Sequence, residues 1–77
     1  MISRQRWDME KAAELARTAY TYVGKTYPAD APLEPLGRAD LVVLEAQERG
    51  DWDGFVEALR ALCRVAKREA IRRERVA

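Results

Sequence analysis

The chain has 77 residues, of which 48% are hydrophobic and 35% charged, with a net charge of +1, one cysteine and no histidine. This hydrophobic content excludes a disordered chain, and the longest apolar run, residues 41–44, is far too short to span a bilayer. Without histidine the chain lacks the usual catalytic triads, histidine metal sites and imidazole acid–base catalysis, so we expect no enzyme activity, no cofactor and no metal ion.

A first helix is predicted over about residues 5–26, with Ser3 or Asp8 as alternative start residues. Apolar side chains recur there every three or four residues, which is typical of a core face: they are Met9, Ala12, Ala13, Ala16, Ala19, Tyr20, Val23 and Tyr27. A neighbouring flank carries other side chains, namely Trp7, Leu15, Tyr22, Lys11 and Thr18. This flank either widens the core contact, with Trp7 over the helix start, or forms a partner-binding patch, because tryptophan and tyrosine beside lysine are typical of interfaces and base stacking.

A proline-rich connector is predicted over residues 27–36. Its three prolines forbid a continuous helix and favour an extended, fairly stiff segment. At about 3.1 Å per residue in the polyproline form, it can run most of the length of the first helix and return the chain to the other end. Leu33 and Leu36 are expected to hold it against the core.

A second, short helix is predicted over about residues 37–49, just after Pro35. Its apolar side chains cover more than one stripe, because Leu41 and Leu44 point away from a side formed by Leu36, Ala39, Val42, Val43 and Ala46. We therefore expect this helix to contact neighbours on two sides as the central element of the fold. Leu41 and Val43 should then be buried, together with Leu59 and Leu62 of the next helix.

The second and third helices are predicted to form a tight hairpin. Gly50 can take the left-handed conformation that ends a helix, and Asp51 can cap the next one. The run Gly50-Asp51-Trp52, followed by Phe55, Leu59 and Leu62, resembles the turn between the two helices of a tetratricopeptide repeat. Ala46, Gly50 and Val56 match the spacing of a DNA-binding helix-turn-helix. The tetratricopeptide-like turn occurs only once in the sequence. In a helix-turn-helix, Asp53 and Glu57 would lie on the DNA-recognition helix and repel the phosphates.

A long third helix is predicted over about residues 52–75, with a seam of Phe55, Leu59, Leu62 and Ala66. Continuing this seam leads to Glu69 and Arg73, so the last two turns cannot bury the same face. At 1.5 Å per residue this helix is about 36 Å long, against about 18 Å for the second, and its C-terminal end is expected to overhang or fray. A marginal core and this overhang predict a dimer or higher homo-oligomer.

The opposite face of the third helix is basic. Residues 54–77 carry a net charge of +4 and residues 28–53 one of −5, so the acidic middle could meet the basic end in the fold or in another copy. A basic face suits an acidic partner, a phosphate backbone or a membrane surface. It can equally be a solvated face with local ion pairs, such as Glu69 with Arg72 or Arg73.

The sequence therefore predicts a single, small all-α domain of three helices. We expect a non-enzymatic accessory or regulatory module that acts through protein–protein interaction, including self-association, with nucleic-acid binding as the alternative. A lone Cys63 and the absence of an apolar leader after Met1 fit a cytoplasmic protein, and no membrane or small-molecule partner is expected. The candidate partner-binding residues are Arg60, Arg64, Lys67, Arg68, Ile71, Arg75, Trp7 and Tyr22.

Overall fold

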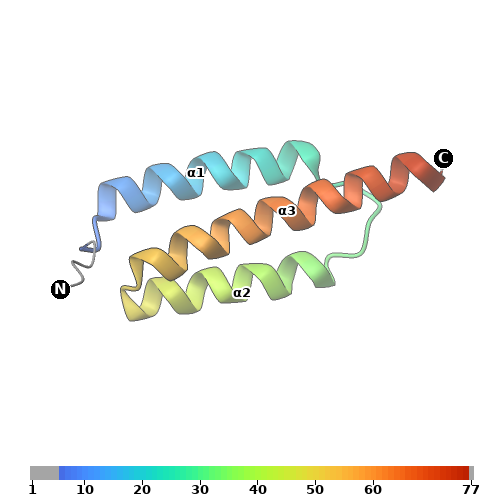
Figure 1. Cartoon of the computed structure of the whole chain (residues 1–77). Coiled ribbons are helices and arrows are strands. Elements are labelled where there is room, and N and C mark those ends of the chain that lie inside the picture. Colours follow the sequence, from blue (N-terminus) through green and yellow to red (C-terminus); the bar gives the residue numbers. More distant parts are fainter. Residues whose placement is uncertain (1–5, 77) are drawn as a thin grey trace.

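A computed structural model describes residues 6–76 of the chain. It contains three α-helices, α1 (Met9–Thr26), α2 (Glu34–Arg49) and α3 (Trp52–Val76), which confirms the all-α fold and the hairpin of the last two helices. Figure 1 shows α3 between the other two helices, with its C-terminal end running beyond both. The molecule is correspondingly elongated and measures 50 × 20 × 19 Å.

Helix α1 begins where a side chain caps it. Asp8 has an extended backbone, and its Oδ1 accepts a hydrogen bond from the Lys11 N–H at 3.1 Å, as an N-cap residue does. Asp8 is one of the two predicted start residues, and residues 6–8 are not helical. The other predicted start, Ser3, lies outside the described residues. The buried face of α1 is also narrower than predicted, because Met9 and Ala13 are exposed. A helix that packs on a single neighbour buries only a narrow stripe.

The connector between α1 and α2 is a short bend. Pro35 lies within the first turn of α2, where its missing N–H breaks no helical bond, so α2 begins three residues earlier than predicted. The remaining residues turn back through a hydrogen bond from the Ala31 N–H to the Pro28 carbonyl at 3.2 Å. The predicted crossing along α1 is wrong, since α2 begins at the end where α1 stops (Figure 1). Ala31 is buried here, whereas Leu33 is 72% exposed.

Helix α3, not α2, is the centre of the fold. In the described part of the chain, α1 and α2 each pack on α3, and their backbones make no direct contact with each other. One side-chain hydrogen bond joins them, from the Tyr20 hydroxyl to Asp40. The core therefore gathers around α3, with Trp52, Phe55, Ala58, Leu59, Leu62 and Ala66 buried.

Helix α2 carries two apolar stripes, and within residues 6–76 the second one does not pack on a second helix as predicted. Val43 and Ala46 are buried against α3, as expected, but Leu41 is 56% exposed and Leu44 is 46% exposed. The prediction that Leu41 is buried is therefore wrong. Since α2 has α3 as its only packed neighbour among the described residues, its second apolar stripe faces outward.

The turn between α2 and α3 has the predicted chemistry. Gly50 has φ +67° and ψ 26°, in the left-handed region. The Asp51 N–H donates to the Ala46 carbonyl at 2.9 Å, which closes the end of α2, while Asp51 Oδ1 accepts from the Gly54 N–H at 3.0 Å and caps α3. Both helix ends in the hairpin are therefore closed by hydrogen bonds.

Gly50→Ala is expected to lower the free energy of unfolding by about 1–2 kcal/mol, because a Cβ disfavours the left-handed conformation. The matched control is Gly24→Ala, which places the same methyl group on helical α1 with no atom within 4 Å. This control should raise stability by up to about 1 kcal/mol, since alanine is the better helix former. Chemical denaturation checks the pair, and shifts of the same sign would contradict the assigned turn.

The C-terminal end of α3 overhangs and also contacts the connector. The Arg73 guanidinium pairs with Asp30, with Nη1 2.8 Å from Oδ2, so the acidic middle does meet the basic end at this point. Glu69 lies 3.8 Å from Arg72 and 3.9 Å from Arg73, the two local pairs considered from the sequence. These arginines are therefore occupied within the fold.

Candidate functional site

An open groove of about 560 Å³ runs between α1 and α3. Helix α1 contributes four of its lining residues and α3 contributes five, and no lining residue comes from α2. The lining residues are Leu15, Thr18, Ala19, Tyr22, Val56, Leu59, Arg60, Cys63 and Arg64. The groove follows from the packing of two helices whose facing flanks carry side chains of unequal size, with small Ala19 beside larger Leu15 and Tyr22.

The interior of the groove is apolar. Ala19 and Leu59 are buried, and Tyr22 is 40% exposed on the wall. The Thr18 hydroxyl donates to the Glu14 carbonyl of its own helix at 3.1 Å, so it offers no donor to a ligand while that bond is made. Burial raises the pKa of the Cys63 thiol, which therefore stays protonated and acts as a small apolar group. An occupant of this groove has to present apolar side chains.

Two arginines supply positive charge at the α3 side of the groove. Arg60 lies 3.3 Å from Glu57, a pair in which both side chains are about two-thirds exposed. Among residues 6–76, no carboxylate lies within 4 Å of the Arg64 guanidinium. The groove therefore combines an apolar interior with a cationic edge that is only partly neutralised.

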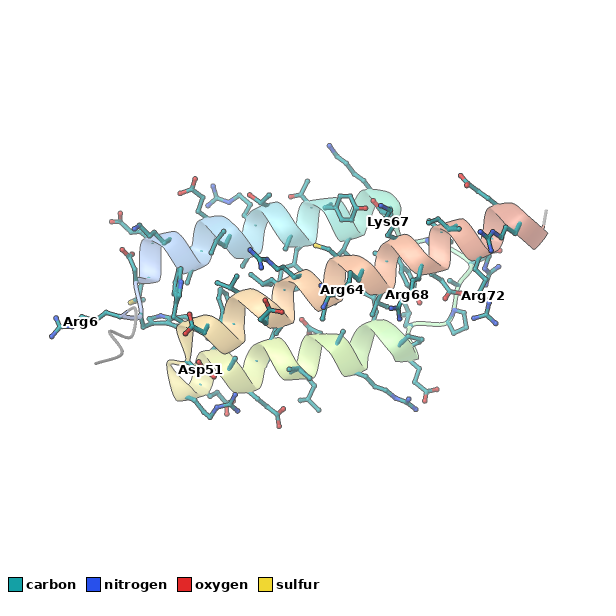
Figure 2. All side chains as sticks on the ribbon, in the orientation of Figure 1. Arg6, Asp51, Arg64, Lys67, Arg68 and Arg72 are labelled. Atoms are coloured by element: carbon teal, nitrogen blue, oxygen red, sulfur yellow. The ribbon has the colours of Figure 1, made fainter. Side chains whose placement is uncertain are left out.

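The structure separates the eight candidate residues into three groups. Tyr22, Arg60 and Arg64 come together in the groove, although they are far apart in the sequence. Further along α3 lie four exposed residues, Lys67, Arg68, Ile71 and Arg75. Figure 2 shows Arg64, Lys67, Arg68 and Arg72 following one another along this helix.

Trp7 stands apart from the other candidates. Its ring packs edge-on against Phe55 at 4.9 Å and against Trp52 at 5.7 Å between ring centroids. Trp7 is half-buried in this aromatic cluster and does not line the groove. Trp7 thus packs on the first turns of α3, and its role in partner binding stays a prediction.

Several lining residues were not among the predicted candidates. Leu15 and Thr18 were grouped with Tyr22 on one flank of the first helix, and this was the available signal for a common surface. Leu59 belongs to the predicted core seam of the third helix, and Val56 and Cys63 flank that seam. Their role in the groove depends on α1 lying beside α3. The prediction placed the second helix at the centre of the fold and therefore did not bring the first and third helices together.

The described residues contain no group of three histidine, cysteine, aspartate or glutamate side chains able to hold a metal ion. Likewise, none of the three described helices combines the length and apolar character needed to cross a membrane. Comparison of the chain with protein families, curated proteins and solved structures found no match. The geometry of the groove is therefore the basis for a functional proposal.

Proposed function

We propose that this protein is a non-enzymatic accessory or regulatory module that binds another protein through the groove between α1 and α3. The observation that carries the proposal is the combination of an apolar interior with Arg60 and Arg64 at the edge. The occupant that fits is an amphipathic helix with acidic residues beside its apolar face. Such helices bind grooves by inserting side chains spaced three or four residues apart.

The two parts of the groove have different roles in this proposal. Burial of apolar side chains supplies most of the binding energy at protein interfaces, so Tyr22 and Leu15 are the expected anchors. Exposed arginines contribute more to orientation and to the rate of association. Arg64 is the better placed of the two arginines, because Arg60 already has Glu57 nearby.

Nucleic-acid binding is the second candidate function, and one observation favours it. Arg64, Lys67 and Arg68 follow one another along α3, and no carboxylate of the described residues lies within 4 Å of their charged groups. A phosphate backbone could contact such a row. The net charge of +1 and the apolar groove beside the row favour the protein partner.

The test uses synthetic amphipathic helical peptides with leucines at three- and four-residue spacing and glutamates along one edge, followed by fluorescence anisotropy. Replacing Arg60 and Arg64 by glutamine, or Tyr22 by alanine, is expected to weaken binding about tenfold. The matched control replaces Lys67 and Arg68 by glutamine, which removes the same charge outside the groove. It should weaken binding by less than about threefold. Peptides with lysines in place of glutamates should bind more weakly.

Duplex and single-stranded nucleic acids serve as the competing probes. If one of them binds at physiological salt, if both glutamine pairs weaken it equally, and if Tyr22→Ala leaves it unchanged, the protein-binding proposal is overturned. The salt slope would then fall by somewhat less than one unit for each phosphate contact removed. Failure of every peptide to bind at about 1 mM would also refute the proposal.

A further inference from the structure

The outward face of α2 carries an apolar stripe that the groove does not use. Leu41 and Leu44 lie three residues apart on this face, half-exposed, and Gly37 lies one turn before Leu41. Helix α2 forms one edge of the molecule, with α3 between it and α1 (Figure 1). No atom lies within 4 Å of a Cβ placed on Gly37, so another backbone could approach there.

We propose that this face binds a second copy of the chain, with the two α2 helices packed antiparallel about a two-fold axis. In this arrangement Leu41 of each copy packs on Leu44 of the other, as the apolar positions of a seven-residue repeat do. Gly37 then faces the region around Glu48 of the second copy. The proposal does not depend on the groove, because no α2 residue lines it.

Charge complementarity selects both the partner and its direction. Arg38 and Glu45 are seven residues apart and therefore lie on the same edge of the leucine stripe. When two copies pair antiparallel, Arg38 of one faces Glu45 of the other, and the two-fold axis makes this contact twice. A parallel pair would instead bring Glu45 towards Asp40 of the second copy, which places like charges together.

The monomer leaves these groups available. Arg38 makes only a local pair with Glu34, and its side chain is 78% exposed. Among the described residues, no basic group lies within 4 Å of the Glu45 carboxylate. The contact is one helix wide and so belongs to the small interfaces, below about 1,200 Å². We therefore expect a weak dimer that dissociates on dilution.

A charge-swap experiment tests the proposed pairing by sedimentation equilibrium. Arg38→Glu places two carboxylates opposite each other in its homodimer, and Glu45→Arg places two guanidinium groups opposite each other, so each variant alone should dimerise at least about tenfold more weakly. Mixed in equal amounts, the two variants restore both opposite-charge contacts. The mixture should therefore form a heterodimer.

Two controls keep the outcome clear. Circular dichroism should show unchanged helix content for both variants, because neither side chain is part of the core. Arg64→Gln, which changes the groove, should leave dimerisation unchanged. A natural chain that stays monomeric at about 1 mM, or a mixture that dimerises no more than its separate components, would overturn the inference. Peptide binding by the groove would remain unaffected in that case.

Discussion

Leu62→Ala is expected to leave much of the chain unfolded at room temperature. Leu62 is 0% exposed and packs with Val23 of α1 and Ala66 of α3. Truncating a fully buried leucine to alanine lowers the free energy of unfolding by about 2–5 kcal/mol. A core of this size rarely supplies more than about 3–5 kcal/mol in total. Thermal and urea denaturation followed by circular dichroism measure the loss.

Leu41→Ala is the matched control for this variant, since it removes the same atoms from a helix at a site that is mostly exposed. We expect a change in stability within about 0.5 kcal/mol, as for most surface substitutions. The comparison is made at low micromolar concentration, so that the proposed dimer does not contribute to the measured stability. An equally large loss in Leu41→Ala would contradict the central position of α3.

Trp7→Ala is expected to destabilise the fold by about 2 kcal/mol, because it removes the aromatic contacts with Trp52 and Phe55. Trp7 precedes α1, whereas its two partners belong to the first turns of α3. The cluster therefore ties the start of α1 to the start of α3. Chemical denaturation measures the effect, with the tryptophan fluorescence spectrum reporting on the cluster itself.

The control for Trp7→Ala is Tyr22→Ala, which should weaken peptide binding while changing stability little. The folded fraction of Trp7→Ala should in turn bind the acidic peptide as the natural chain does. If Trp7→Ala lost peptide binding without losing stability, Trp7 would belong to the partner-binding surface. The two variants thus separate the two interpretations of the aromatic flank.

The sequence predicted the helices well because local chemistry determines where they begin and end. Gly50 and Asp51 define the hairpin turn, and both make the expected hydrogen bonds. Thr26 ends α1 just before the proline-rich segment, as predicted. Asp8, one of the two start residues predicted for the first helix, caps α1. Helix α2 begins earlier than predicted because Pro35 is accommodated inside its first turn.

The arrangement of the helices could not be predicted in the same way. A helical wheel shows which side chains share a face, but not which neighbour covers that face. Leu41 and Leu44 suggested two neighbours for α2, whereas one of its two stripes faces outward. The same limitation hid the groove, because Tyr22 and Arg64 meet only when α1 lies beside α3.

The layer-like order of the three helices, with α3 in the middle, has a consequence for how the chain folds. The α2–α3 interface joins segments that are neighbours in sequence, so forming it costs little loop-closure entropy. Forming the α1–α3 interface closes a longer loop, which includes all of α2. If α1 detaches, the contacts between α2 and α3 stay in place. We therefore expect helix α1 to dock last and to open first, as a separate cooperative unit on a preformed hairpin.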